Sequence, residues 1–534
     1  MREDDFKSIV TEAREAFAAP SVSAAVQVGD QIWRHAVGDR GLTGGAVDAD
    51  TVYPVASVSK AFMAACVMML VDEGRLELDA PVKRHLPELE LWTKELTEQL
   101  TVRDMLTHRS GLPRHDVTSF TRPDATLAQT VAYLRWLEPR WGLRERFGYQ
   151  NHMFALASYL VERVSGEPWS AVVRQRIFAP LGLTRAYTAW GEYKSRDDNY
   201  ARLLITRGST AEPIDQLSTD SMACAASLSM SVRDLLRWGS ANLALHALDG
   251  IGGPRGADGG GGIGGGPGGR GGVLALSAAA TRELHSAQMP IRPGEAVPYQ
   301  EPLVEDNAYG LGWFVERHRG APLVHHGGTL RGVKSLVGFM PEHGLALAVL
   351  VNQNDSPVPS LILRQVVDAA LGADPYDWRG FYLGLRDERQ AKTALEYREA
   401  MAPGGGTFEP ACAGDYEHPA YGRMRIADQP DGPRLSTGGE SYRLRAGAKA
   451  PWVIDADDVS QALPCYFDYA DAADAADAAG SADAADAADP AGPPAASVGP
   501  ARARAAVPAA FCAWLEPELD HPIRFERLSS SGLD

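Results

Sequence analysis

The sequence has few of the residues that mark an exported, disulfide-bonded or membrane-spanning protein. Its 534 residues contain no apolar run of the roughly 18 residues that a membrane span needs. The opening segment lacks the basic-then-apolar order of a signal peptide. Five scattered cysteines have no paired spacing and therefore indicate neither a disulfide framework nor a zinc site. They are Cys66, Cys224, Cys412, Cys465 and Cys512. These absences predict a cytoplasmic location.

Positive charge is also scarce. The chain has 52 Lys and Arg against 69 Asp and Glu, which gives a formal net charge of -17 at pH 7. An acidic surface repels phosphates and anionic lipids, so this balance argues against nucleic acid and membrane as partners. Only eight of the 52 basic residues are lysine. A lysine in a patterned position is therefore more informative than usual.

A chain of this length exceeds one ordinary core, so two or three domains are expected. Residues 250–272 are mostly glycine, and residues 470–506 repeat Ala-Asp-Ala before becoming Pro- and Ala-rich. Neither stretch buries enough apolar surface to offset its ordering entropy, so both are predicted to be disordered insertions. We expect a first domain over 1–372, a charged helical linker over 373–404 and a small β-domain over 405–530.

The hydrophobic pattern predicts an α/β (α+β) fold. Alternation around Gly29-Asp30 predicts a hairpin over 24–37, and the apolar stretch 57–73, closed by Gly74, predicts a buried helix. Two early and three late strands then flank a mainly helical middle, which suits an antiparallel or mixed sheet covered by helices. The further helices are expected over 4–18, 102–107, 154–165, 232–243 and 361–371, and the late strands over 312–316, 333–340 and 345–352.

Short strand-like runs follow residue 404 at 421–426, 442–445 and 522–526, separated by Gly, Pro and Asp turns. This spacing predicts a small antiparallel barrel or sandwich.

Ser57-Val58-Ser59-Lys60 places a hydroxyl and an amine on one face of the expected buried helix. A serine hydroxyl needs a nearby base to become a nucleophile, and a lysine can serve where burial lowers its pKa. The helix N-terminus also offers free N–H groups for an oxyanion. In isolation the motif fits equally a helix cap at Ser57 and a surface charge at Lys60.

Tyr149-Gln150-Asn151 is the second candidate and precedes an expected helix. A tyrosinate held by cations can act as a general base, while an Asn amide can orient an amine and a substrate carbonyl. By themselves, Tyr149 also fits a packing residue and Asn151 a helix cap.

His325-His326-Gly327-Gly328-Thr329 is the third candidate and comes just before the late strands. Two glycines let a backbone approach a ligand closely. Adjacent histidines invite a metal, but no second cluster of His, Cys or carboxylates has ligand spacing. No metal and no organic cofactor are therefore expected, and a turn with incidental histidines remains an alternative.

The three motifs in this order resemble the serine β-lactamase and penicillin-binding-protein superfamily, specifically its branch of class C β-lactamases, D-aminopeptidases and esterases. The resemblance covers about residues 5–372. It also rests on Tyr53-Pro54-Val55-Ala56 before the serine, on residues 100–112 and on residues 309–313. Residues 412–422 and 522–527 resemble the small lipocalin-like domain often appended to such hydrolases.

The resemblance implies a role for each motif. Ser57 would form the acyl-enzyme, Lys60 and Tyr149 would share proton transfer, and Asn151 would orient the substrate. The backbone N–H groups of Ser57 and Thr329 would form the oxyanion hole, with Gly328 beside it.

His326 stands where most β-lactamases and penicillin-binding proteins carry the lysine of Lys-Thr-Gly. A lysine is a permanent cation for a substrate carboxylate, whereas a histidine is largely neutral at pH 7. The departure favours a peptidase, amidase or esterase over an antibiotic-degrading enzyme.

The expected function is therefore a serine hydrolase of small amides, short peptides with D-residues, or esters. A β-lactamase or D-Ala-D-Ala carboxypeptidase is the alternative enzyme, and a catalytically silent binding or scaffold protein is the alternative of another class. A small-molecule or short-peptide substrate is the expected partner, and a homo-oligomer stays open.

Overall fold

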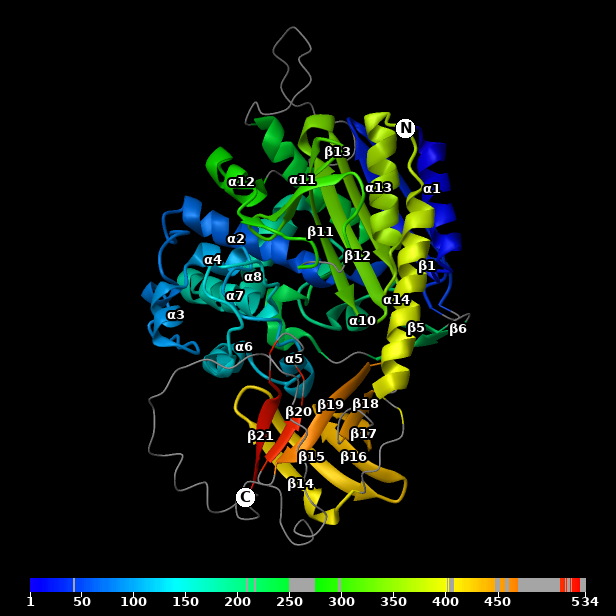
Figure 1. The fold of residues 1–534 in the computed structure, drawn as a ribbon. Helices are drawn as coiled ribbons and strands as arrows, with labels where there is room; N and C mark the ends of the chain where they lie inside the picture. Colours follow the sequence, from blue (N-terminus) through cyan, green and yellow to red (C-terminus); the bar gives the residue numbers. More distant parts are fainter. Residues whose placement is uncertain are drawn as a thin grey trace. The chain divides into compact units, whose positions relative to one another are not determined.

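The computed structural model describes residues 1–41, 44–207, 210–215, 218–248, 274–295, 299–400, 402, 408–446, 452–456, 461–468, 510–513, 515, 519 and 521–528. The two insertions expected at 250–272 and 470–506 lie outside the described residues. The chain divides into two compact units. One comprises Met1–His115 and Pro123–Asp387, and the other comprises Asp116–Arg122 and Glu388–Asp534. Figure 1 shows the elements of each unit.

An eight-stranded antiparallel sheet forms the centre of the first unit, in the order β2-β1-β13-β12-β11-β10-β9-β8. The N-terminal hairpin joins the late strands directly, because Val22 of β1 lies opposite Val351 of β13. The strands are β1 Ser21–Val28, β2 Gln31–Gly38, β8 Met289–Pro290, β9 Val304–Tyr309, β10 Phe314–His318, β11 Ala321–Leu330, β12 Val333–Met340 and β13 Leu345–Val351.

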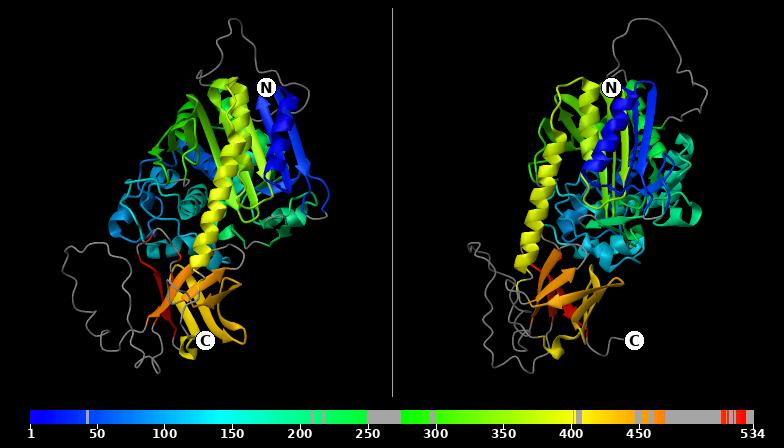
Figure 2. Two further views of the ribbon diagram at one scale, coloured as in Figure 1. Left: turned by 45° about the vertical axis from the view of Figure 1, so that its right-hand side comes forward. Right: turned by 90° about the vertical axis from the view of Figure 1, so that its right-hand side faces the viewer.

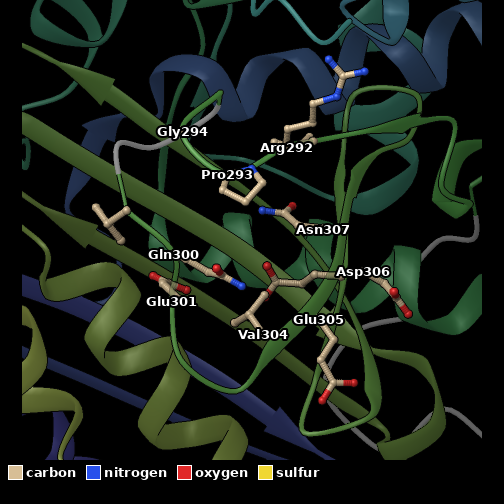
Figure 3. A pocket seen from close by; sticks show the side chains of 12 residues that line it. Arg292, Pro293, Gly294, Gln300, Glu301, Val304, Glu305, Asp306 and Asn307 are labelled. Atoms are coloured by element: carbon tan, nitrogen blue, oxygen red, sulfur yellow. The ribbon is translucent and has the colours of Figure 1, made fainter.

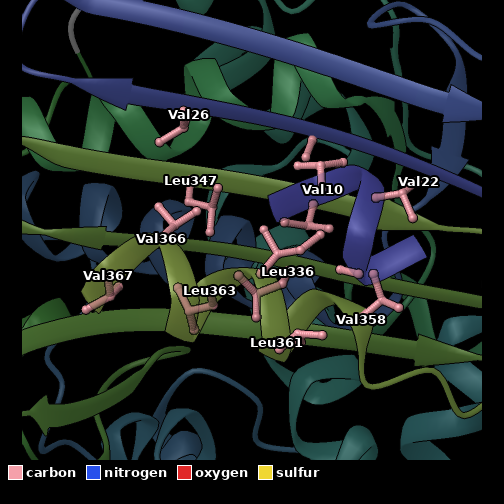
Figure 4. Packing of buried hydrophobic residues seen from close by; sticks show 14 of the residues in the cluster. Val10, Val22, Val26, Leu336, Leu347, Val358, Leu361, Leu363, Val366 and Val367 are labelled. Carbon is pink, nitrogen blue, oxygen red and sulfur yellow. The ribbon is translucent and has the colours of Figure 1, made fainter. Parts of the chain in front are cut away.

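Helices cover both faces of this sheet, as the two views of Figure 2 show. On one face α1 (Glu3–Ala16) and α13 (Val358–Leu371) pack on each other and on the strands, and Trp378 and Tyr382 of α14 (Trp378–Ala400) join the same core. Figure 4 shows the core beneath them, where side chains such as Val10, Val26 and Leu336 are buried. On the other face α11 (Val232–Leu248) packs on β1, β12 and β13.

The helical part of the first unit surrounds α2 (Ser59–Asp72). Every residue of α2 from Ser59 to Leu70 is buried, which confirms the helix expected from its apolar run. The other helices are α3 Lys94–Gln99, α4 Val102–Leu106, α6 Leu127–Tyr133, α7 Asn151–Ser165, α8 Trp169–Val173, α9 Ala179–Leu181, α10 Glu192–Arg196 and α12 Ala278–His285. The short elements include η1 Ala56–Val58, η5 Asp220–Ala225, β3 Val52–Pro54, β4 Ala186–Tyr187, β5 Leu204–Arg207, β6 Thr210–Pro213 and β7 Ser229–Ser231.

The second unit is a closed barrel of eight antiparallel strands, since β14 pairs with both β15 and β21. Its strands are β14 Gly414–His418, β15 Gly422–Gln429, β16 Gly432–Thr437, β17 Glu440–Arg445, β18 Trp452–Ala456, β19 Gln461–Asp468, β20 Ala510–Ala513 and β21 Ile523–Arg527. The buried side chains include Tyr416, Met424, Phe511 and Phe525.

The helix α5 (Val117–Thr121) belongs to the barrel unit, although it lies early in the sequence. Arg122 Nη2 donates to the Pro419 carbonyl at 2.8 Å. Gly438 has a φ of +58°, and a Cβ there would lie 1.8 Å from the Phe120 carbonyl oxygen. Any side chain at position 438 would collide with the backbone of α5, so this contact requires glycine.

The fold class expected from the sequence is confirmed, with one correction to its detail. The His325–Thr329 segment precedes β12 and β13 as expected, but it lies inside the further strand β11 and not in a turn. Its two glycines weaken the strand signal, and β9 lacks apolar alternation, so periodicity alone finds fewer strands than the sheet contains. Within the described ranges, no helix combines the length and the apolar character that crossing a membrane requires.

A buried ion cluster fastens α13 to the sheet. The Arg364 guanidinium is 3% exposed and binds Glu316 of β10 and Glu301. Burial opposes ionisation of Glu316, but the positive charge of Arg364 outweighs it and holds the pKa of this carboxyl well below its usual value.

We expect Arg364→Ala to lower the free energy of unfolding by about 3–5 kcal/mol, because it strands two carboxylates without their cation. Urea denaturation followed by tryptophan fluorescence measures the change. Arg84→Ala is the matched control, because its pair with Glu77 is exposed and contributes less than about 1 kcal/mol. Equal effects of the two substitutions would contradict a stabilising role for the cluster.

Candidate active site

The turn that carries Ser57 is fixed on three sides. The Val55 N–H donates to the Leu228 carbonyl at 2.9 Å, and the Val55 carbonyl accepts from Ser335 Oγ at 2.6 Å. Ser59 Oγ donates to the Ala56 carbonyl at 2.6 Å. Ala56 has a φ of +49°, an uncommon conformation for a residue with a side chain. The strained residue thus directly precedes the serine, and contacts from Leu228, β12 and α2 hold the turn around it.

Lys60 is completely buried and its ammonium has three acceptors from different elements. Nζ lies 3.0 Å from Ser57 Oγ, 2.6 Å from Asn151 Oδ1 and 2.9 Å from the Ala225 carbonyl oxygen. The i and i+3 spacing predicts the first contact. The second joins two motifs that are far apart in the sequence, and the third depends on η5.

The backbone on either side of Tyr149 is held by His108. The His108 carbonyl accepts from the Gly148 N–H at 2.8 Å, and its Nδ1 accepts from the Gln150 N–H at 3.1 Å. This residue has a φ of +55° and is fully buried. Burial, then the positive charge of Lys60, lowers the pKa of His108 well below its usual value, so its ring is neutral near pH 7.

The Tyr149 ring lies between two cations and several rings. Lys60 Nζ is 4.8 Å from its centroid and the Arg114 guanidinium carbon is 5.0 Å away. The rings of His108 and His326 lie 4.3 and 6.4 Å from it, centroid to centroid. Tyr149 therefore sits beside the lysine that contacts the serine, in a setting of positive charge.

His326 is buried and engaged through both ring nitrogens. Nε2 lies 2.8 Å from the Tyr309 hydroxyl and Nδ1 lies 2.7 Å from the Gly327 carbonyl oxygen. Burial, then Lys60, lowers the pKa of His326 well below its usual value, while burial raises the pKa of Tyr309. A neutral imidazole has one donor and one acceptor nitrogen, and a carbonyl oxygen can only accept. Nδ1–H therefore donates to the Gly327 carbonyl, and Nε2 accepts from the Tyr309 phenol.

Strand β11 approaches the serine turn at Gly328. A Cβ on this residue would lie 2.2 Å from the Val55 carbonyl oxygen and 3.0 Å from Ala56 Cβ. Glycine is thus required by the contact itself. One residue on, the Thr329 hydroxyl accepts from Lys334 Nζ at 2.9 Å across the strand pair.

The structure brings together the side chains proposed from the sequence. Ser57, Lys60 and Asn151 form one hydrogen-bonded group, Tyr149 contacts Lys60, and His326 packs near Tyr149. Sequence reasoning did not single out His108, Tyr309 or Arg114. The first two lie in stretches that matched the family as a whole, but their contacts come from the folded chain.

A separate cavity of about 330 Å³ lies next to β9 and contains none of these residues (Figure 3). Gln300, Glu301, Val304 and Asn307 are among its lining residues. Its carboxylates Glu301 and Glu316 already bind Arg364. Among the described residues, no three His, Cys, Asp or Glu side chains group in a way that would hold a metal ion.

Comparisons with known proteins agree with this geometry. The sequence model of the family described as Beta-lactamase matches residues 6–371. An unguisins hydrolase from Aspergillus campestris is 25% identical over 447 residues, which cover 79% of this chain and 77% of that protein. A second, from Aspergillus violaceofuscus, is 27% identical over 460 residues, with coverages of 81% and 78%.

Two solved structures share the fold. A penicillin-binding protein homologue from Pyrococcus abyssi has a TM-score of 0.58 at 20% identity and covers 88% of this chain and 96% of its own. The D-amino acid amidase from Ochrobactrum anthropi SV3 has a TM-score of 0.52 at 21% identity, with coverages of 68% and 99%. The family match spans most of the chain and includes every proposed site residue, and the chain therefore belongs to the beta-lactamase family.

Proposed function

We propose that this β-lactamase-fold hydrolase works through a Ser57 acyl-enzyme. The observation that carries the proposal is the fully buried Lys60 ammonium, which contacts Ser57 Oγ and Asn151 Oδ1 together. A buried lysine within hydrogen-bond distance of a serine, in a turn at a helix start, is the arrangement that nucleophilic catalysis needs. A silent scaffold has no need of this group, so the contact favours turnover.

In the proposed first step, Ser57 Oγ bonds to the substrate carbonyl carbon while its proton passes to the Lys60–Tyr149 pair. The oxyanion would bind the backbone N–H groups of Ser57 and Thr329, and the close approach of Gly328 to Val55 and Ala56 supports this pairing. Collapse of the tetrahedral intermediate breaks the bond to the leaving group. The same pair returns the proton to that group, and Asn151 orients the substrate.

In the second step, water gives a proton to the pair and its oxygen attacks the Ser57 ester. The ester bond breaks, the acid product leaves, and Ser57 Oγ regains its proton. Each proton is thus stored on Lys60 or Tyr149 and returned, so no external acid or base is consumed.

We propose small amides, short peptides including those with D-residues, or esters as substrates. Support comes from His326, which is a neutral, fully hydrogen-bonded imidazole where the antibiotic-binding relatives carry a lysine. The unguisins hydrolases, matched over about four fifths of this chain, are named for hydrolysis rather than for binding penicillin. A β-lactamase or D-Ala-D-Ala carboxypeptidase remains the second candidate, because the serine group is the same.

We expect an uncharged fluorophosphonate probe to label the wild-type protein and not Ser57→Ala. Lys60→Met should slow labelling by about 10²–10⁴-fold, since it removes one member of the pair that accepts the proton. Ser158→Ala is the control, because it removes a buried helical hydroxyl that donates to the Phe154 carbonyl. Mass spectrometry of the labelled peptide reads out the site. Undiminished labelling of Ser57→Ala would refute the nucleophile, and an unlabelled wild type would favour the scaffold.

Nitrocefin, D-alanine p-nitroanilide and p-nitrophenyl acetate, compared in one assay, test the substrate class. We expect kcat/KM for nitrocefin to fall below the better of the other two by about 10–100-fold, because its carboxylate loses a charge-assisted hydrogen bond at His326. Nitrocefin turning over fastest by orders of magnitude would instead establish the β-lactamase.

A further inference from the structure

We propose that Arg114 is a positioning residue that lowers the proton affinity of Tyr149, so that the Lys60–Tyr149 pair accepts the Ser57 proton near neutral pH. The inference rests on the proposed acyl-enzyme and adds the source of the charge that activates it. Nothing in the sequence motifs marks this arginine, which lies between the buried Pro113 and His115.

The groups around the Tyr149 ring divide into charged and neutral ones. The cations against the ring are Lys60, from α2, and Arg114, from the segment after α4. Among the ring contacts described for Tyr149, the other titratable side chains are His108, Tyr309 and His326. Burial lowers the pKa of both imidazoles and raises the pKa of the Tyr309 phenol, so these three carry no charge near pH 7. Arg114 therefore adds a positive charge that none of these three supplies.

Arg114 is an exposed residue whose two chain neighbours are held in place. The Pro113 carbonyl accepts from Gln150 Nε2 at 2.6 Å, which ties the segment to the residue after Tyr149. On the other side, His115 is buried and its Nε2 lies 2.9 Å from the Glu138 carbonyl oxygen. The guanidinium between these anchors lies over the Tyr149 ring. An arginine stays protonated at every working pH, so this charge is permanent, unlike that of an imidazole.

A fixed cation beside a phenol stabilises the phenolate and lowers its pKa. Removing the charge of Arg114 should therefore raise the apparent pKa of the Lys60–Tyr149 pair, which titrates as a unit. Because Arg114 is exposed and its charge is screened, we expect a shift of about half a unit to one unit. The rate on the acidic side of the profile should fall roughly 3–10-fold, and the alkaline plateau should stay the same.

The test is the rate of Ser57 phosphonylation by an uncharged fluorophosphonate, measured from pH 5 to 9. In this reaction Ser57 Oγ bonds to phosphorus, fluoride leaves, and the serine proton goes to the pair. The uncharged probe removes any contribution from binding of a substrate carboxylate. Arg114→Gln should move the acidic limb to higher pH, and Arg114→Lys, which keeps the charge, should restore it.

Arg163→Gln is the matched control. Arg163 is half-exposed and lies 5.9 Å from the Tyr159 ring centroid, but it stands twelve residues after Asn151 on α7, about 18 Å along the helix. Its profile should coincide with the wild type. Raising the salt concentration should shift the wild-type limb in the same direction as Arg114→Gln and leave that variant nearly unchanged.

If the pH–rate profile of Arg114→Gln coincides with that of the wild type on the acidic side, the inference is wrong. The proposed acyl-enzyme mechanism would not be affected by that result. A uniform loss of rate at every pH that Arg114→Lys does not restore would also overturn the inference, because that pattern indicates a structural role. Labelling that persists in Ser57→Ala would instead refute the proposed function itself, so the two failures are distinguishable.

Discussion

The burial of one lysine is the constraint on which the site depends. An ammonium without water needs an acceptor for each of its protons, and leaving it unpaired is costly. Lys60 finds its acceptors on Ser57, on Asn151 at the start of α7 and on the Ala225 carbonyl at the end of η5. Three parts of the chain must therefore meet at one atom. The nearly wholly apolar helix α2 removes the water, and the three acceptors replace it. The same contacts fix the Ser57 hydroxyl relative to the Lys60 ammonium.

The sheet meets the serine turn through two neighbouring strands, β11 and β12. Gly328 of β11 lies against the carbonyl of Val55 and the side chain of Ala56, at a distance no other residue tolerates. Ser335, opposite Gly328 on β12, donates to the same Val55 carbonyl. The strained Ala56 thus lies between β11, β12 and α2. Because these contacts tie the serine turn to the sheet, the turn has little freedom to move. Pre-organisation of this kind reduces the reorganisation that an oxyanion would otherwise demand.

Much of this could be predicted from local patterns. The hairpin before β3, the buried helix after Ser57 and the late strands follow from periodicity, and the i, i+3 spacing predicts the contact of Ser57 with Lys60. What could not be predicted depends on tertiary contacts. The hydrogen bonds from the backbone on both sides of Tyr149 to His108 have no sequence signature. The hydrogen bond between the Tyr309 phenol and the His326 imidazole joins β9 to β11 and also depends on the folded chain. The membership of α5 in the barrel unit is equally invisible, because seven residues interrupt the first unit.

The neutral His326 adds no positive charge beside Tyr149. A lysine in place of His326 would be a permanent cation that could serve two purposes, holding a substrate carboxylate and stabilising the phenolate. An imidazole with both nitrogens engaged and a low pKa serves neither. If Arg114 supplies the positive charge that activates Tyr149, no cation is needed at His326. The residue of β11 at this position can then stay uncharged. On this proposal, a substrate without a carboxylate beside its scissile bond would suit the site better than a β-lactam, and Ser57, Lys60 and Tyr149 would perform the same chemistry.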